Sequence, residues 1–461
     1  MWLGPGTSGT RGTCGTGRTC GTGGTCGTCG TRGTRGTRMK SVSGTAIVVG
    51  LLCAASVAQS SLAGEWMITV HEQFGPNVMR LSLAVSGDKL SGSLGTRKLE
   101  GIASGQSIEF TIDKATSKGT LDAGQLRGET VFPDRTVKWT AVRIPARPAA
   151  ARTHDFEPSE FHLYFSSQIK PALRIHPGDT IRTWAVDAGG RDRQSTRRSA
   201  GGNPQTGPFY VEGALPNDTL VVRLTRVRTN RDWAGSGNSI MRNALEPGML
   251  GNIKWAPDFS SRWTIDSGKG IAFLEKPTEA LKRFVVPLQP MLGCVAVAPP
   301  GESSIRTADS GRFGGNMDYN QIREGTTIYL PVYHPGALLF VGDGHAAQGD
   351  GELTGDALET SMDIEFTVDV IAGQTVGHPL AENAEFLISI GIGGSLDQAL
   401  QQATSGMVRW LERDYKLTAN EAAMILGFAV KYDVVDLVGT QVSIAAKIPK
   451  ATITQLTKGG I

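Results

Sequence analysis

The sequence predicts a mainly β protein, with a β-sandwich core, a C-terminal α+β region and a small antiparallel β barrel or sandwich ahead of both. Short, partly alternating apolar runs recur through residues 62–144, and longer strand-like runs between glycine- and proline-rich loops fill residues 154–370. Two helical patterns lie within residues 395–431. Alternation with a period of two is typical of half-buried strands, whereas apolar spacing near 3.6 residues indicates helices.

The beginning of the chain predicts a leader and a signal peptide. Residues 5–38 repeat Gly-Thr with Arg or Cys interposed, so we expect residues 1–38 to be a disordered leader or to precede the true start of translation. A basic start at Met39-Lys40, an apolar run at 46–55 and the small residues Ser56-Val57-Ala58 predict a cleaved signal at 39–58 and export to the periplasm or medium. A membrane anchor is the alternative, but the run is shorter than the roughly 20 residues that span a bilayer.

Charge and cysteine content exclude several kinds of partner and site. The formal charge is +3, but residues 1–38 hold five arginines and no acid, so 3 − 5 = −2 remains for residues 39–461. This balance supports neither a nucleic-acid partner nor, after signal cleavage, a membrane partner. Cys294 is the one cysteine after residue 58, which excludes an intrachain disulfide. It begins an apolar run, so we expect a buried small hydrophobe rather than a nucleophile.

The remaining chain divides into two modules. Residues 62–144 form the small β domain, and a linker rich in Pro, Ala and Arg follows at 145–153. We expect Trp66 and Trp139 to fill the core of this domain, with ligand stacking as the alternative. Residues 154–455 form the second module, whose expected strands are 180–186, 220–227, 293–298, 327–330 and 337–341.

Local capping signals place the two helices. Ser395 can cap a helix that runs to about Arg413, and Thr418 with Glu421 forms a capping box for residues 419–431. Their apolar stripes predict core packing or a subunit contact, and we expect a homo-oligomer.

The segment 333–365, YHPGALLFVGDGHAAQGDGELTGDALETSMDIE, sets one imidazole and several carboxylates between closely spaced glycines. Glycines let a backbone turn sharply enough for short polar side chains to converge, so the chemistry is expected here. Because each glycine would cost about 1 kcal/mol in a helix interior, the pattern favours a strand, a glycine-rich loop and a second strand.

These residues resemble the acetamidase/formamidase family, whose hallmark is a run close to GDxHAxQGDGE followed by another glutamate. The matching positions are Gly342, Asp343, His345, Ala346, Gln348, Gly349, Asp350, Gly351, Glu352 and then Glu359. Segments 182–189 (RTWAVDAG), 202–213 (GNPQTGPFYVEG), 312–318 (RFGGNMD) and 447–450 (KIPK) are similar to the same family in the same order. The resemblance covers about residues 154–455 and implies a jelly-roll-like sandwich and an amidase that acts on small linear carboxamides such as formamide or acetamide. It does not cover the first 150 residues.

Residue chemistry suggests roles for the polar side chains in these motifs. Amide hydrolysis needs an activated water, stabilisation of the oxyanion and a proton for ammonia, and a divalent metal beside a carboxylate can supply all three. The expected metal ligands are Asp187, His345 and Glu359, with zinc as the expected metal. The expected catalytic residues are Glu352, as general acid/base, and Asp343, which would orient His345. Asn316 and Asp318 are expected to shape the amide pocket.

Each assignment has an alternative. Asp187 and Asn316 also suit turns, because Asp and Asn bond their own backbone there. The rival function is a non-catalytic binding protein in which the carboxylates of Asp343, Asp350 and Glu352 hold a structural calcium ion. His345 favours the enzyme, because imidazole suits zinc better than calcium.

Overall fold

The computed structural model describes residues 61–73 and 75–456 and confirms the mainly β fold. The expected leader at 1–38 and signal at 39–58 lie outside the described residues. None of the helices in the described ranges is both long enough and apolar enough to span a bilayer.

The first folded part is a closed up-and-down barrel, in which β1 pairs with both β2 and β8. Its strands are β1 Gly64–Glu72, β2 Gly75–Ser86, β3 Lys89–Leu94, β4 Arg97–Ser104, β5 Ser107–Ile112, β6 Ala115–Asp122, β7 Gln125–Val131 and β8 Thr136–Arg143. Closure leaves no unpaired edge, which is the main liability of an isolated sheet.

Two tryptophans fill the barrel, as the sequence predicts. Trp66 and Trp139 are each 1% exposed, and the Trp139 indole donates a hydrogen bond of 3.0 Å to the Ser117 hydroxyl. The Trp139 ring occupies the space where side chains at Gly119 and Gly128 would begin, since a Cβ at either position would lie 2.4 Å from the ring. The barrel interior is therefore a packed core.

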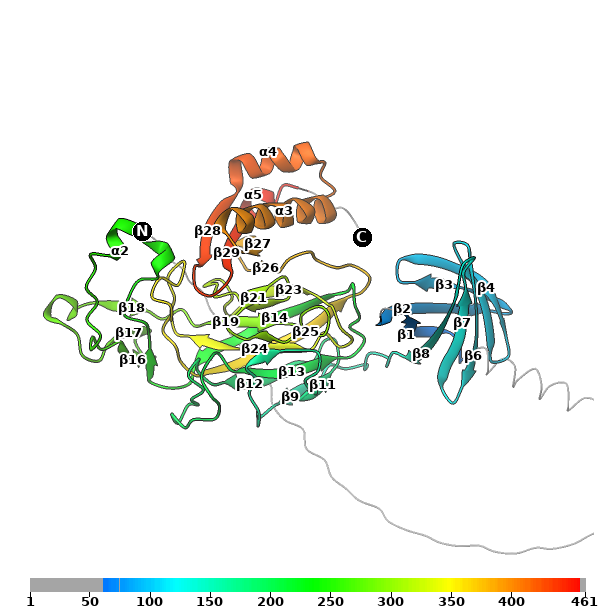
Figure 1. Ribbon diagram of the computed structural model, residues 1–461, viewed down its shortest axis with the longest axis horizontal. Helices are drawn as coiled ribbons and strands as arrows, with labels where there is room; N and C mark the ends of the chain where they lie inside the picture. Colours follow the sequence, from blue (N-terminus) through cyan, green and yellow to red (C-terminus); the bar gives the residue numbers. More distant parts are fainter. Residues whose placement is uncertain (1–60, 74, 457–461) are drawn as a thin grey trace, which may run out of the picture. The chain divides into compact units, whose positions relative to one another are not determined.

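The second part is built on two large sheets with one core between them (Figure 1). The six-stranded sheet runs β11 Leu173–Ile175, β13 Gln205–Val211, β24 Leu339–His345, β19 Met291–Ala296, β22 Gly314–Asn316 and β21 Ser310–Gly311. The nine-stranded sheet runs β28 Lys431–Asp436, β29 Val442–Pro449, β27 Phe386–Gly393, β26 Leu380–Glu382, β23 Thr327–Pro331, β14 Thr219–Thr229, β25 Met362–Ile371, β12 Thr180–Ala185 and β9 Thr153–Asp155. Buried side chains of both sheets, such as Val295, Phe340 and Phe366, meet in the core of a sandwich.

Smaller elements surround the sandwich. A four-stranded sheet contains β15 Trp233–Gly235, β16 Arg262–Asp266, β17 Ile271–Leu274 and β18 Val285–Pro287, and β10 Tyr164–Phe165 pairs with β20 Ile305–Arg306. Helices α3 Leu396–Tyr415 and α4 Ala419–Ala429, orange in Figure 1, share a core with β27 and β29. The remaining short helices are α2 Pro247–Leu250, α5 Lys450–Ile453, η1 Arg242–Ala244 and η2 Glu279–Leu281.

The helix caps are confirmed. The Ser395 side chain accepts a hydrogen bond from the Gln398 backbone N–H, and Thr418 and Glu421 form the expected capping box. Both caps satisfy backbone donors that a helix leaves unpaired at its first turn.

One expected boundary differs in a way that matters for the site. The strand expected at 337–341 instead runs Leu339–His345, through Gly342 and Gly344. A Cβ at Gly342 would lie 2.6 Å from the Gln205 side chain, and one at Gly344 would lie 2.9 Å from the Thr360 carbonyl oxygen. These glycines therefore permit close packing within a strand, whereas Gly351 and Gly355 adopt the positive φ of turns.

Replacing Trp139 by alanine tests the packed barrel core. Truncation of a buried tryptophan typically costs about 3–5 kcal/mol, so Trp139→Ala should accelerate amide hydrogen exchange across β1–β8, measured by mass spectrometry. Ile102→Ala, at a side chain that is 55% exposed, is the control and should leave exchange nearly unchanged. Unaltered protection in Trp139→Ala would contradict a core that depends on this ring.

Candidate active site

The candidate active site begins at the end of β24, on the strand that carries the hallmark motif. Asp343 and His345 are two residues apart, and both side chains lie over Gly293 of the neighbouring strand β19. A Cβ at Gly293 would lie 2.4 Å from Asp318 Oδ1, 2.6 Å from Asp343 Oδ2 and 3.0 Å from His345 Cε1. The missing side chain on β19 thus creates the space that the polar groups share.

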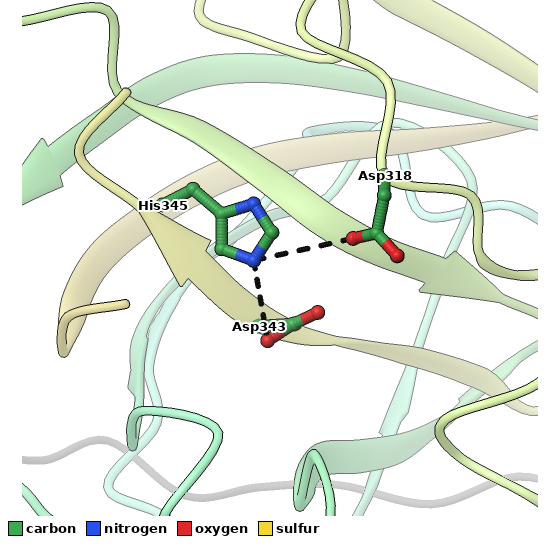
Figure 2. Close-up of side chains that lie close together, drawn as sticks. All are labelled: Asp318, Asp343 and His345. Carbon is green, nitrogen blue, oxygen red and sulfur yellow. Dashed lines mark ion pairs between the residues drawn. The ribbon is translucent and has the colours of Figure 1, made fainter. Parts of the chain in front are cut away.

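A cluster of carboxylates surrounds the His345 imidazole (Figure 2). His345 Nε2 lies 3.0 Å from Glu359 Oε1, 3.5 Å from Asp343 Oδ1 and 4.0 Å from Asp318 Oδ1. Ligand atoms lie within 4.8 Å of one another in three overlapping groups: Asp318, Asp343 and His345; His345, Glu352 and Glu359; and Asp318, Glu352 and Asp436. We call these six residues the acidic cluster.

Four polar atoms of the acidic cluster are buried and have no hydrogen-bond partner. His345, Asp343 and Asp318 are at most 2% exposed. Among the residues that the structure describes, His345 Nε2, Asp343 Oδ1, Asp318 Oδ1 and Glu359 Oε2 have no hydrogen-bond partner. An unpaired buried polar atom is costly, and unpaired atoms of mainly one charge that converge on one point suit a cation.

A glutamine presents His345 Nε2 to this point. Gln348 donates through Nε2 to the Asp318 carbonyl oxygen, which turns its Oε1 toward His345 Nδ1 at 2.8 Å. Because Oε1 can only accept, Nδ1 carries a proton. When Nε2 loses its own proton, as metal binding requires, the lone pair lies on Nε2. A second hydrogen bond of this kind is typical of metal-binding histidines. Gln348 thus supplies an orienting contact at Nδ1. Asp343, to which sequence reasoning assigned the orienting role, lies 3.5 Å from Nε2 on the other side of the ring, and that role stays a prediction.

Burial, with repulsion from neighbouring carboxylates at some of them, raises the pKa of several of these carboxyl groups. Burial raises the pKa of Glu352 to about 8, with Glu359 and Asp343 adding to the shift and His345 opposing it. Burial likewise raises the pKa of Glu359 to about 7 and of Asp436 to about 7. Burial, Glu352 and Asp343 raise the pKa of Asp318 well above its usual range. Burial lowers the pKa of His345, but Glu359 and Asp343 outweigh it and raise the value well above normal. Glu352 is therefore suited to proton transfer near neutral pH.

Three of the carboxylate residues adopt strained backbone conformations. Asp318, Asp343 and Glu352 have φ of 44°, 58° and 46°. Left-handed backbone costs a residue other than glycine roughly 1–3 kcal/mol, and such residues cluster at functional sites. The surrounding sheets hold these side chains in place at that cost.

Asn316, which was expected to shape the amide pocket, hydrogen-bonds to the acidic cluster. Asn316 donates to Asp318 Oδ2 and accepts from Asn203, whose amide also bonds Asp343 Oδ2 at 3.2 Å. Asn316 therefore fixes the carboxylates from one side.

Asp187 lies outside the three groups found in the described ranges. Its Oδ2 is 2.7 Å from the Arg231 guanidinium, and its Oδ1 accepts from the Arg191 backbone at 2.8 Å. Arg231 in turn donates to the Glu359 carbonyl oxygen at 3.2 Å. Asp187 thus supports the segment that carries Glu359, and its role as a ligand stays a prediction.

Sequence reasoning missed Asp436, Asn203 and the orienting role of Gln348. Gln348 lies inside the hallmark motif, three residues after His345, and this short spacing could have indicated a contact between the two side chains. Asp436 ends β28, which no sequence motif connects to the site. It reaches the site through a β-bridge to Gly351, the residue before Glu352.

Cys294 is fully buried beside the acidic cluster. Burial raises the pKa of its thiol well above the ordinary value, and Asp343 and Asp318 add to this shift. Since the thiolate is the nucleophilic form, the environment disfavours a role in covalent catalysis.

Comparison with known proteins identifies relatives of this chain. Residues 285–449 match the Acetamidase/Formamidase family. The chain is 36% identical to an acetamidase of Mycolicibacterium smegmatis over 286 residues, which cover 49% of this chain and 70% of that protein. It is 23% identical to a formamidase of Methylophilus methylotrophus over 244 residues, or 42% of this chain and 60% of that protein. A crystal structure of an acetamidase from Yersinia enterocolitica superimposes with a TM-score of 0.56 at 27% identity, covering 66% of this chain and 93% of that one.

The chain belongs to the acetamidase/formamidase family. It spans about 60% of the length of the formamidases that it matches.

Substitution of Gly293 tests the shared space. Gly293→Ala places a methyl group against Asp318 and Asp343, so it should weaken zinc binding at least about tenfold, measured by competition with a chromogenic chelator. Gly427→Ala adds a methyl group where nothing lies within 4 Å and is the matched control. Equal zinc affinity in the two variants would show that zinc binding does not depend on the space left by the absent side chain at Gly293.

Removal of the Gln348 side chain tests the orientation of the imidazole. In Gln348→Ala the proton on His345 is no longer fixed to Nδ1, so zinc affinity should fall by about 10–100-fold. Titration calorimetry with zinc measures this change. An unchanged affinity would contradict the hydrogen-bonded tautomer.

The raised pKa values predict how the metal-free protein responds to pH. Glu352 keeps its proton up to about pH 8 when folded but loses it near pH 4 to 5 when unfolded. Between these values the folded state binds more protons, so this group makes the free energy of unfolding fall as pH rises. In chelated protein, Glu352→Gln should therefore raise the melting temperature at pH 8 and change it little at pH 4.5. The exposed Glu302→Gln is the control for calorimetry, and equal effects of both variants would contradict the buried carboxyl.

Proposed function

We propose that this protein hydrolyses carboxamides to a carboxylate and ammonia, with a divalent cation bound in the acidic cluster. The observation that carries the proposal is the convergence of His345 Nε2, Asp343 Oδ1 and Asp318 Oδ1, all buried and unpaired, beside Glu352. The names of the acetamidase and formamidase relatives support amide hydrolysis, with formamide and acetamide as the first substrates to test.

The donor set fits a cation. Asp318, Asp343 and His345 would hold it, with Glu359 next to them, and the negative charge of the cluster would be offset. Zinc is proposed because one donor is imidazole, and calcium is the alternative that the oxygen atoms allow. When bound, such an ion would polarise the amide carbonyl and make water more acidic.

Glu352 is the proposed proton carrier. Hydrolysis requires water oxygen to bond the carbonyl carbon, the C–N bond to break and a proton to reach the departing nitrogen. A carboxylate at Glu352 takes the proton from the attacking water and the resulting carboxyl group delivers it to nitrogen. The Ala357 backbone N–H donates to Glu352 Oε1 at 2.9 Å and fixes the direction of this side chain.

The remaining residues keep the ligands in place. Gln348 fixes the tautomer of His345, and Asn316 with Asn203 holds Asp318 and Asp343. Asp187 supports the ligands indirectly, because its ion pair with Arg231 steadies the segment that carries Glu359.

The proposal is tested by ammonia release from formamide and acetamide, measured before chelation, after chelation and after zinc or calcium is restored. Wild-type activity should disappear with chelation and return with one of the two metals. Glu352→Gln should keep bound metal, measured by mass spectrometry of the elements, and lose at least about 100-fold in kcat. Comparable turnover in this variant would remove Glu352 from proton transfer, and chelator-resistant activity would remove the cation.

Export is a separate proposal that rests on residues 39–58. N-terminal sequencing of the processed protein should begin at Gln59, and an unprocessed N-terminus on protein recovered from the cytoplasm would contradict it.

A further inference from the structure

A cavity of 480 Å³ adjoins the acidic cluster. Part of the lining comes from residues 236–289, which include β16, β17 and β18 of the four-stranded sheet, and part from residues 347–358, which follow β24. Gln348 and Glu352 line the cavity and also belong to the machinery around His345. The cavity therefore leads to the proposed proton carrier.

Much of the cavity lining is apolar. The apolar lining residues include Trp263, Phe284, Val286, Pro287, Leu353 and Leu358. The Trp263 and Phe284 rings meet edge to face with centroids 6.2 Å apart, and the Trp263 indole N–H is already bonded to the Ser236 hydroxyl at 3.0 Å. These rings thus offer apolar contact without an unpaired donor.

Two of the lining side chains are unusually exposed for their type. Phe284 is 49% exposed and Leu353 is 43% exposed. The charged side chains among the described lining residues, Asp350 and Glu352, are acidic. A neutral, apolar group would cover the exposed surface, whereas a negatively charged group would be repelled.

The cavity is much larger than a two-carbon amide needs. Acetamide has four non-hydrogen atoms, each comparable to a water molecule with a share of liquid volume of about 30 Å³. A volume of 480 Å³ lies within the range of about 300–1,000 Å³ that is typical of pockets for larger ligands.

We infer that the preferred substrate is a primary carboxamide with a bulky, uncharged apolar acyl group, branched or aromatic, which lies between Trp263, Phe284 and Leu353. This inference rests on the proposed amide hydrolysis and defines its substrate class. The amide group meets Glu352 and the acidic cluster, and the acyl group fills the cavity.

A series of amides tests the inference on the purified, zinc-loaded protein. Ammonia release is measured for acetamide, isovaleramide, phenylacetamide and the anionic succinamate, and aniline release for N-phenylacetamide. We expect kcat/KM for phenylacetamide to exceed that for acetamide by at least about tenfold, since one well-placed methylene already contributes about tenfold or more. Succinamate and N-phenylacetamide should be poorer substrates than phenylacetamide.

Two wall variants locate the acyl group. Phe284→Ala removes an exposed ring and Val286→Trp narrows the cavity, and each should lower the ratio of kcat/KM for phenylacetamide to that for acetamide by about fivefold or more. Ile102→Ala, in the barrel, is the control and should keep the wild-type ratio. Circular dichroism verifies that each variant is folded.

The outcomes distinguish failure of the acyl pocket from failure of amide hydrolysis. Faster hydrolysis of acetamide than of phenylacetamide, or wall variants with the wild-type ratio, would overturn the acyl pocket and leave amide hydrolysis intact. Preference for N-phenylacetamide would place the apolar group on nitrogen and overturn the inference as stated. Failure to hydrolyse any amide would overturn the proposed function together with it.

Discussion

The constraint on which the structure depends is the burial of several carboxylates around one imidazole. Charged groups are expensive to remove from water, and like charges within a few ångströms repel each other. Glu352, Glu359 and Asp436 respond by holding protons to about pH 7 or 8. A divalent cation would offset both the loss of hydration and the repulsion between carboxylates. It attracts each ionised carboxylate and occupies the point toward which the unpaired atoms converge.

The sandwich makes this arrangement sterically feasible. Gly293 leaves the floor of the site open, while Gly342 and Gly344 let β24 lie close to its neighbours, so that Asp343 and His345 are carried by a rigid strand. Asn203, Asn316 and Gln348 come from three separate segments and hydrogen-bond to Asp343, Asp318 and His345. The loop that supplies Glu352 also lines the apolar cavity. One short segment therefore carries both the proposed proton carrier and part of the proposed acyl pocket.

Much of the fold follows from local sequence signals. Helix caps at Ser395 and Thr418 were predictable because their hydrogen bonds close within three residues, and the barrel core was predictable from Trp66 and Trp139. The motif also brought Asp343, His345, Glu352 and Glu359 into one candidate site. What could not be predicted depends on distant pairing: Asp436 reaches the site through β28, and Asp187 meets Arg231, which the sequence does not mark as its partner. The sequence predicted that Gly342 and Gly344 serve a turn, but both lie within β24 and permit close packing. A sequence does not distinguish a glycine needed for a turn from one needed for close packing.

Zinc-edge X-ray absorption of the protein loaded with one equivalent of zinc shows whether the acidic cluster binds the metal. We expect a shell of nitrogen and oxygen ligands at about 2.0–2.2 Å, with imidazole scattering that disappears in His345→Ala. A shell made of water oxygens alone, or imidazole scattering that persists in His345→Ala, would contradict cation binding by the acidic cluster.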